Sequence, residues 1–279
     1  MAIRTLKEVL QDPHQNKYGI GMFDVFNLEM TKAVIRAAEK ENTPVIMALA
    51  EVHAPTKEKF EEIANIMVFA AKRATVPVVL HLDHGCSMEI IETALACGFS
   101  SVMYDGSILP YEENVKNTQK VVAMAKQYGV SVEAELGHVG GNEGEDGVVD
   151  DDIIYTEPDI AQDFVEKTKV DALAVSIGTA HGLYRKTPKL RFDILKQIRE
   201  TVDVPLVLHG GSGLSEEDFI GCIENGISKV NIYTEIVKGA DAISEKRVPE
   251  GVGYYQLMEE TQDAMEEVVA KKIRLFKNK

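Results

Sequence analysis

Eight short apolar runs alternate with helix-patterned stretches along the 279-residue chain. The runs are rich in aliphatic and β-branched residues and several are continuously apolar, which is typical of parallel strands buried on both faces. In order, they are Tyr18–Phe23, Pro44–Ala50, Pro77–Leu82, Ser100–Tyr104, Val130–Leu136, Asp171–Ile177, Val204–Leu208 and Lys229–Tyr233. The amphipathic stretches between them are Leu28–Glu41, Lys57–Ala74, Met88–Cys97, Glu112–Tyr128, Pro158–Thr168, Phe192–Thr201 and Glu216–Asn225. This alternation predicts one domain, residues 1–279, folded as a TIM (β/α)8 barrel; an open doubly wound sheet is the alternative.

Two segments depart from the alternation. Residues 137–152 follow the fifth run, are rich in glycine and acidic residues, and are predicted to form a long mobile loop at the active site. Ser244–Gly253 is a second polar insertion, followed by an amphipathic helix predicted over Tyr254–Phe276. The apolar face of that helix fits either a subunit interface or simple capping of the barrel.

Composition excludes several classes of protein. The formal net charge of −15 disfavours general nucleic-acid binding, because the phosphate backbone would be repelled, and it requires local features to hold any anionic substrate. Three cysteines without CxxC spacing (Cys86, Cys97 and Cys222) favour a reducing compartment over a disulfide framework. No apolar run reaches the roughly 18 residues of a membrane span, and the charged N-terminal residues do not resemble a signal peptide. A cytoplasmic protein without membrane or nucleic-acid partners is the expectation.

Polar and charged residues gather where the predicted strands end. Active-site groups of such barrels come from the carboxyl ends of the strands, which meet at one rim. The residues placed there are Asp24, Asn27, Glu51, His53, His81, Asp83, His84, Asp105, Glu133, Glu135, His181, His209, Asn231 and Thr234. The pattern predicts one site at that rim.

Three of the seven histidines stand just beyond strands, and each precedes a glycine that allows a sharp turn: His84, His181 and His209. Three converging imidazoles suit a catalytic Zn²⁺ with a fourth position left for substrate. Alternatively, each is an isolated hydrogen-bonded histidine. The remaining histidines are assigned differently: His14 and His138 to the surface or loops, His81 to the barrel interior, and His53 to no role.

Carboxylates accompany these histidines. Asp83 precedes His84, so both side chains can reach one pocket, where Asp83 could move a proton or merely orient a ligand. Asp105 and Glu135 are candidates for an alternate metal position, for partners of the ligands, or for a purely structural role.

A glycine-rich turn, Gly210–Gly213, precedes a helix predicted to begin near Ser215. Its backbone N–H groups and the helix terminus can cradle phosphate, and phosphate sites after strands seven and eight are common in this fold.

Five segments together resemble the class II aldolases of the fructose- and tagatose-bisphosphate type. They are His81–Gly85, Glu133–Gly137, Ala174–Tyr184, Leu208–Gly213 and Val230–Glu235, so the resemblance covers nearly the whole chain. It implies a zinc-dependent aldehyde-lyase that reversibly cleaves a ketose phosphate to dihydroxyacetone phosphate and an aldehyde. It also implies a homodimer or homotetramer, and a second metal or a monovalent cation is found in some relatives.

The resemblance implies a role for each matching position. His84, His181 and His209 hold the zinc, with Glu135 and Asp105 near an alternative metal position. Asp83 moves the proton of the hydroxyl at the bond being cleaved, and Asn231 adds a hydrogen bond to the intermediate. Glu143, or Glu145 if the loop is shifted, moves the proton on the three-carbon unit. The residues implied in binding dihydroxyacetone phosphate are Gly182, Gly210, Gly211, Ser212, Asn231 and Thr234, and Asn27 is added as a substrate-binding candidate from its place after the first strand.

The chain also departs from the family's pattern. Asp24 stands where asparagine is usual, and Ala50 replaces a serine that binds the far phosphate of bisphosphates. The arginine that precedes the last helix and reaches a neighbouring subunit aligns with Tyr255, and Arg247 fits only with a shift. Two anion donors are thus absent or moved, while carboxylates (Asp24 and Glu51) repel phosphate and suit hydroxyl groups. We therefore expect a ketose 1-phosphate and a non-phosphorylated aldehyde, with a 1,6-bisphosphate as the alternative.

Rival functions follow from the same residues. A metal-dependent sugar-phosphate epimerase could use this barrel, and a non-catalytic paralogue could keep the sugar-phosphate pocket. A Schiff-base mechanism is disfavoured because no lysine occupies the matching strand ends, except Lys229 at the start of the eighth run.

Overall fold

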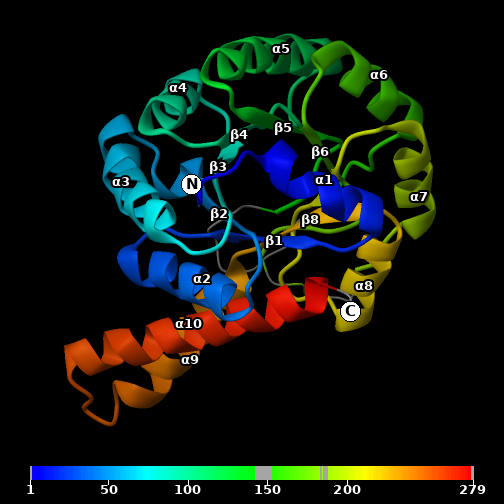
Figure 1. The fold of residues 1–279 in the computed structure, drawn as a ribbon. Helices are drawn as coiled ribbons and strands as arrows, with labels where there is room; N and C mark the ends of the chain where they lie inside the picture. Colours follow the sequence, from blue (N-terminus) through cyan, green and yellow to red (C-terminus); the bar gives the residue numbers. More distant parts are fainter. Residues whose placement is uncertain (1, 142–152, 183, 185–187, 278–279) are drawn as a thin grey trace.

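The computed structural model describes residues 2–141, 153–182, 184 and 188–277. Its eight parallel strands pair in sequence order, and β1 pairs with β8 to close a barrel (Figure 1). The strands are β1 (Ile20–Asp24), β2 (Val45–Ala50), β3 (Val78–Gly85), β4 (Ser101–Tyr104), β5 (Ser131–Leu136), β6 (Ala172–Val175), β7 (Leu206–Leu208) and β8 (Ile227–Ile232). The predicted (β/α)8 barrel is confirmed, and the open doubly wound sheet is excluded.

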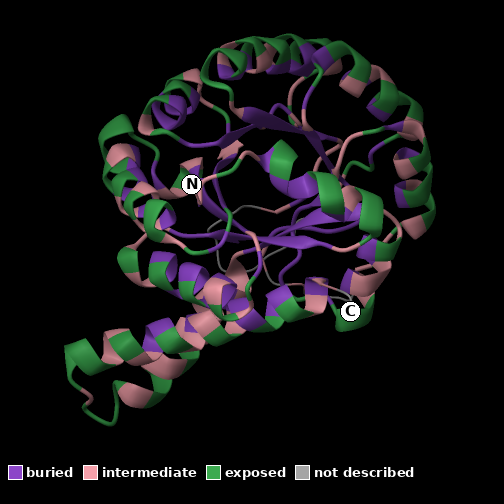
Figure 2. Cartoon of the chain, viewed as in Figure 1, coloured by how far each residue is buried: buried purple, intermediate pink, exposed green. Residues whose placement is uncertain are grey.

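Helices surround the barrel and cover its outer face (Figure 1). They are α2 (Leu28–Lys40), α3 (Lys57–Arg73), α4 (Met88–Cys97), α5 (Tyr111–Tyr128), α6 (Pro158–Thr168), α7 (Phe192–Thr201), α8 (Glu216–Glu224) and α10 (Tyr254–Phe276), whereas α9 (Thr234–Arg247) packs mainly on α10. Their buried faces pack on outward-pointing strand residues such as Phe23, Leu80 and Val230 to form the main apolar core. Figure 2 shows the strands buried and the outer faces of the helices exposed.

An N-terminal helix, α1 (Leu6–Asn16), crosses one end of the barrel (Figure 1). Its buried residues Leu6, Val9 and Leu10 belong to a second apolar cluster. The other members of this cluster include Met22 and Val79, which point into the barrel from the N-terminal parts of the strands. The helix is capped by a reciprocal Thr5–Glu8 capping box. Because α1 closes this end, access to the interior is from the carboxyl ends of the strands.

The predicted polar insertion Ser244–Gly253 is wrong in its first part, because α9 continues through Arg247. The Arg247 side chain pairs with Glu260 of α10 at 2.6 Å and also with Glu250, which ties the two helices together. The α9–α10 hairpin extends away from the barrel, and its far end is mostly exposed (Figures 1 and 2). The predicted helix Tyr254–Phe276 is present with those bounds.

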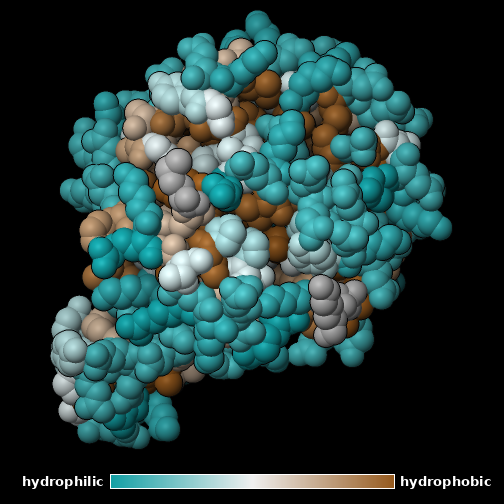
Figure 3. Space-filling model, in the orientation of Figure 1, coloured by the Kyte–Doolittle hydropathy of each residue, from teal (hydrophilic) through white to brown (hydrophobic). Residues whose placement is uncertain are grey.

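The face that carries α1 is mainly hydrophilic, with small apolar areas (Figure 3). Among the described residues, no helix combines the length and apolar character needed to cross a bilayer. These features agree with the charged composition of the chain.

Candidate active site and metal centre

The inward-facing residues of the strands change from apolar to polar toward the carboxyl ends. Along β3 the order is Val79, His81, Asp83, and the two polar side chains are fully buried. Side chains two residues apart share one strand face, so this alternation places both in the barrel. Glu133 and Glu135 of β5 are likewise buried in the interior. The predicted site therefore lies at the open end of the barrel, above the apolar layer that α1 covers.

Three histidines meet at this end. The ligand-capable nitrogens of His84, His181 and His209 lie within 4.8 Å of one another. The ring centroid of His84 is 4.9 Å from that of His181 and 4.6 Å from that of His209. The arrangement brings together the three residues predicted as zinc ligands, from β3 and from the segments after β6 and β7.

The backbone turn at β3 differs from the expectation that the following glycine supplies it. Gly182 and Gly210 take φ values of 84° and 64°, but at β3 it is His84 itself that adopts φ 43°. A non-glycine residue in this region carries strain, and such residues concentrate at functional sites. Gly85 is needed for space instead, because a Cβ there would lie 2.6 Å from the Met103 carbonyl oxygen.

Two carboxylates orient the imidazoles. His84 Nδ1 lies 2.7 Å from Asp105 Oδ2, and His209 Nε2 lies 3.0 Å from Glu133 Oε1. Since a carboxylate accepts, each ring donates from that nitrogen and keeps a lone pair on the other. Those other nitrogens, His84 Nε2 and His209 Nδ1, face each other at 2.8 Å. Two facing lone pairs repel unless a cation lies against both, so the donor set fits a metal such as Zn²⁺.

The electrostatics of the histidines agree with this role. Burial, followed by the charge of His84, holds the pKa of His181 and of His209 well below its ordinary value. Burial favours a higher pKa for Asp105, but its hydrogen bond to His84, the charge of His84 and the hydrogen bonds from Ser107 together outweigh this and lower the pKa. The site thus presents neutral His181 and His209 rings beside an ionised Asp105 carboxylate, which are the protonation states that bind metal.

Asp83 is fully buried next to this cluster. Its Oδ2 lies 3.8 Å from His84 Nε2, and its Oδ1 accepts a hydrogen bond of 3.3 Å from Asn231 Nδ2. Burial raises the pKa of Asp83, although the charges of His84 and Lys229 oppose the shift. A carboxylate with a raised pKa beside a metal position is suited to accept a proton.

A second candidate metal position shares one histidine with the first. His84, Asp105 and Glu135 also present ligand atoms within 4.8 Å of one another. Burial, then the charge of Asp105, holds the pKa of Glu135 well above its ordinary value, and its Oε1 accepts from the Val139 amide at 3.1 Å. A cation at this position would relieve the repulsion between the two carboxylates.

Lys229 lies inside the barrel, where it forms an ion pair rather than presenting a free amine. Its Nζ is 2.9 Å and 3.0 Å from the two oxygens of Glu133, and both side chains are fully buried. Glu133 therefore joins Lys229 to the zinc-ligand candidate His209. This placement supports rejection of a Schiff-base lysine.

The Lys229–Glu133 pair yields a stability prediction. Lys229→Met should lower the free energy of unfolding by about 3 kcal/mol, because it leaves the buried Glu133 carboxylate without its cationic partner. The double variant Lys229→Met/Glu133→Gln should regain more than half of that loss. Urea denaturation measures the free energy of unfolding of the single and the double variant, and a chelator in every sample removes any contribution from bound metal. Equal destabilisation of the two variants would show that the unpaired charge is not the cause.

A narrow crevice of about 20 Å³ adjoins the histidines. It is lined by Asp24, His181, Gly182, Gly210, Gly211, Ser212, Asn231, Tyr233 and Thr234. Six of the seven predicted substrate-binding residues are in this set.

The helix that starts at the crevice is α9, which begins at Thr234. The sequence predicted that α8 would supply the helix N-terminus, but α8 begins with Glu216, Glu217 and Asp218. Acidic side chains in the first turn of α8 disfavour a phosphate there, so the α9 terminus suits an anion better.

The turn after β7 gives a second stability prediction. Gly210 has φ 64°, and a Cβ there would collide with the Ala180 carbonyl, whereas Gly98 has φ 88° and nothing within 4 Å. Gly98→Ala should therefore cost about 1 kcal/mol from backbone strain alone. Gly210→Ala should cost about 3 kcal/mol, because steric overlap adds to the strain. Thermal unfolding of both variants tests the difference, and equal costs would count against the close approach.

Three sequence expectations need correction or relocation. Asn27 is not in the crevice: its Oδ1 accepts from the Met30 amide at 2.9 Å as the N-cap of α2. Glu51 does not face a substrate hydroxyl, because its Oε2 accepts from the amides of Cys86 at 2.7 Å and Ser87 at 3.0 Å. His14 is less exposed than a surface residue and lies near Asp203. For Asn27 and Glu51, a hydrogen bond to nearby backbone amides takes the side chain.

The other expectations divide between placed and undescribed residues. Fully buried His81 bonds Ser101 Oγ at 2.8 Å in the barrel interior, as predicted. The loop glutamates, Glu143 and Glu145, lie outside the described residues, as does most of the segment 137–152. Tyr255 is 76% exposed on α10, and the Arg247 side chain pairs within the α9–α10 hairpin, so neither lines the crevice.

Sequence reasoning did not assign a role to Glu133 or Tyr233. Glu133 could have been found from its spacing, because it shares one strand face with Glu135. Tyr233 lines the crevice directly before α9, a helix that was not predicted.

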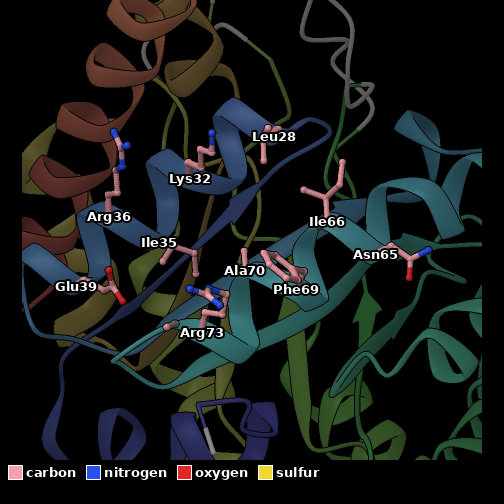
Figure 4. Close-up of a pocket in the computed structure, with 11 residues that line it drawn as sticks. Leu28, Lys32, Ile35, Arg36, Glu39, Asn65, Ile66, Phe69, Ala70 and Arg73 are labelled. Atoms are coloured by element: carbon pink, nitrogen blue, oxygen red, sulfur yellow. The ribbon is translucent and has the colours of Figure 1, made fainter.

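A larger hollow, about 570 Å³, lies on the outside of the barrel between α2 and α3 (Figure 4). Its walls include exposed Phe69 and Leu28 with Ile35, Lys32 and Arg73 around them. It contains none of the metal-ligating clusters found among the described residues. The chemistry is therefore assigned to the barrel mouth despite the smaller volume there.

Comparison with known proteins identifies the family of this chain. The family model described as fructose-bisphosphate aldolase class-II matches residues 4–279. The fructose-bisphosphate aldolase of Staphylococcus aureus is 44% identical over 237 residues, covering 84% of this chain and 82% of that protein. That of Staphylococcus epidermidis is 40% identical over 281 residues, covering 99% of this chain and 98% of that protein.

Solved structures give the same family. The YdjI aldolase of Escherichia coli K12 superposes with a TM-score of 0.88 at 38% identity, covering 98% of this chain and 97% of that chain. The fructose-bisphosphate aldolase of Campylobacter jejuni, at 22% identity and a TM-score of 0.81, shows the shared fold alone. Because the family model spans nearly the whole chain and curated relatives reach 44% identity, the chain belongs to the class II fructose-bisphosphate aldolase family and is an aldolase, a lyase.

Proposed function

We propose that this aldolase is zinc-dependent and reversibly cleaves a ketose 1-phosphate to dihydroxyacetone phosphate and a non-phosphorylated aldehyde. The observation that carries the proposal is the convergence of His84, His181 and His209 beside buried Asp83 and a glycine-lined crevice. When bound, zinc supplies a Lewis acid that stabilises negative charge developing on the three-carbon unit. Glu135 and Asp105 are proposed as an alternate metal position.

The crevice is proposed to hold the phosphate of the triose. Gly182, Gly210 and Gly211 bring backbone close to a ligand, and Ser212 and Thr234 add hydroxyl groups. Thr234 is also the first residue of α9, whose N-terminus carries positive partial charge. These donors can bind a phosphate although the whole chain is acidic.

Asp83 is proposed to move the proton that cleavage requires. As the bond between carbons 3 and 4 breaks, its electron pair stays with the triose, and the proton of the hydroxyl on carbon 4 passes to the Asp83 carboxylate. A proton then returns to carbon 3, a step proposed for Glu143 or Glu145. Asn231, already bonded to Asp83, is placed to hydrogen-bond the triose oxygen as charge accumulates.

The choice of a monophosphate rests on charges at the mouth. No lysine or arginine is among the described residues that line the crevice, whereas buried Asp24 is. Ala50, which lies opposite Asp83 in the β2–β3 register, offers no hydroxyl. Among the described residues that line the crevice, a second phosphate would meet a carboxylate and no lysine or arginine. A 1,6-bisphosphate is the alternative, supported by the names of the Staphylococcus relatives.

A retro-aldol panel tests the proposal. Triose-phosphate release is measured from paired ketose 1-phosphates and 1,6-bisphosphates of the same stereochemistry, with and without a chelator. Preference for the monophosphates, lost on chelation, is the expected result. Efficient cleavage of a bisphosphate without such preference would defeat the substrate assignment. Isomerised ketose without triose release would show an epimerase, and no turnover of any sugar would favour a non-catalytic paralogue.

The assembly and location are proposed from surface features and thiols. Exposed Val248, Tyr254 and Tyr255 gather at the far end of the α9–α10 hairpin, which suits contact with another copy in a homodimer or homotetramer. Three free cysteines suit the reducing cytoplasm.

A further inference from the structure

Three aromatic side chains form a wall beside the crevice. Phe26, His53 and Tyr233 follow the ends of β1, β2 and β8, which are neighbouring strands in the barrel. The ring centroid of His53 is 5.4 Å from that of Phe26 and 4.7 Å from that of Tyr233, and the centroids of Phe26 and Tyr233 are 6.4 Å apart. Tyr233 also lines the crevice, so the wall continues from the proposed phosphate site toward the rim above β2.

His53 is the unusual member of this wall. Both of its ring nitrogens are shielded from solvent, and neither has a hydrogen-bond partner within the part of the chain that the structure describes. A buried polar atom without a partner costs about 1–3 kcal/mol, so such atoms are rare unless something else binds them. The residue as a whole is only partly buried, so the wall has unmet hydrogen-bonding capacity close to the protein surface.

The protonation state of this ring limits what it can recognise. Burial, followed by the charge of Lys59, lowers the pKa of His53 to about 4. At neutral pH the ring is therefore uncharged, with one donor and one acceptor. This pairing matches a hydroxyl group, which both donates and accepts, better than it matches a phosphate.

The position of the wall fits one part of the substrate. The triose phosphate is assigned to the crevice, and the bond that breaks is assigned to Asp83. Ala50 lies opposite Asp83 in the β2–β3 register, and His53 follows three residues later at the rim. Substrate carbons beyond the breaking bond therefore extend past Asp83 toward the end of β2.

We propose that His53, held between Phe26 and Tyr233, is a specificity-determining residue that hydrogen-bonds an uncharged hydroxyl group on the aldehyde-derived end of the substrate. The inference rests on the proposed aldolase function and deepens it. The alternative is that the exposed Lys59, whose charge acts on His53, favours a phosphorylated aldehyde. The test therefore includes a phosphorylated aldehyde.

The test compares two rates in the zinc-loaded enzyme. Exchange of the α-proton of dihydroxyacetone phosphate with deuterium oxide reports the triose site, and condensation with added aldehydes reports the whole site. The aldehydes are a hydroxyaldehyde, its matched deoxy analogue, and glyceraldehyde 3-phosphate. The variants are His53→Phe, which keeps a ring but removes both nitrogens, His53→Gln, which restores hydrogen-bonding groups, and His14→Gln as a control near the closed end of the barrel.

We expect His53→Phe to lower the preference for the hydroxyaldehyde over its deoxy analogue by about tenfold, the equivalent of one lost hydrogen bond. Its condensation rate with the hydroxyaldehyde should also fall relative to its exchange rate. His53→Gln should recover part of the preference, and His14→Gln should keep the wild-type preference. Partial recovery of the preference in His53→Gln would show that the ring acts by hydrogen bonding and not by packing alone. If His53→Phe does not fold, a changed preference in His53→Gln still tests the inference.

An unchanged preference in folded His53 variants would overturn the inference while leaving the aldolase intact. A loss confined to glyceraldehyde 3-phosphate would overturn the hydroxyl assignment and favour anion recognition. Wild-type enzyme without proton exchange would instead refute the proposed function, and the inference with it.

Discussion

Replacing His181 by alanine is expected to remove zinc binding and aldol cleavage together. His181 supplies one of only three imidazoles in the cluster, and its ring lies 4.9 Å from that of His84 by centroids. Two remaining imidazoles cannot hold a catalytic ion firmly in neutral solution. Cleavage should fall by at least about 1,000-fold, since most of the charge stabilisation is lost with the ion. Metal analysis after gel filtration and triose-phosphate release measure the two effects.

The matched control for His181→Ala is His14→Ala, in a helix that closes the opposite end of the barrel. This variant should keep the wild-type metal content and activity. Full metal stoichiometry in folded His181→Ala protein would exclude His181 as a ligand. Loss of metal from both variants would point to unfolding, which circular dichroism would reveal.

Asp83→Asn is expected to separate the two halves of the reaction. Asparagine keeps the shape of the side chain and can still accept from Asn231, but it cannot take a proton. Carbon–carbon cleavage should fall by about 100- to 10,000-fold, the range for loss of a positioned acid or base. Zinc content should remain, and dihydroxyacetone phosphate should still exchange its α-proton, because that proton is assigned to a loop glutamate.

Asp105→Asn provides the contrast to Asp83→Asn. Its carboxylate bonds His84 Nδ1 at 2.7 Å, so the change should weaken zinc by about 10- to 100-fold rather than block a proton transfer. Activity of Asp105→Asn should therefore recover when zinc is added in excess. If Asp83→Asn lost metal in the same way, or lost exchange as fully as cleavage, Asp83 would be an orienting group and not the proton acceptor.

The barrel and the cluster of three histidines could be predicted from sequence because their signals are periodic and local. Short, continuously apolar runs such as Pro44–Ala50 favour strands covered on both faces, and helix-period stretches supply that cover. Residues at the ends of parallel strands share one rim, which brings His84, His181 and His209 together without knowledge of any contact distance.

The roles of other polar residues at the strand ends depend on which hydrogen-bond partner each side chain has in the folded protein. Asn27 and Glu51 both stand at strand ends like true site residues, yet each binds backbone amides of a nearby helix start. Helix capping competes with ligand binding for the same short polar side chains, and sequence position does not decide between them. Helix α9 was missed because its residues Thr234–Arg247 are weakly amphipathic and include Gly239, while α10 packs against it from later in the chain.

The left-handed turn at His84 was also beyond prediction, because φ 43° is rare for any residue other than glycine. It is sustained by tertiary contacts, including the bond from its own ring to Asp105. The Glu133 link between Lys229 and His209 likewise joins β5, β8 and the segment after β7, and it has no local signal.

The central claim is that one ion held by three imidazoles supports cleavage. Metal-stripped protein titrated with Zn²⁺ tests it most directly, with triose-phosphate release followed at each addition. We expect no turnover before zinc is added, and a linear rise in rate that ends at one ion per chain. Full turnover by protein shown to be free of metal would contradict a role for the ion. The same zinc-dependent rise in variants of His84, His181 or His209 would contradict their role as its ligands.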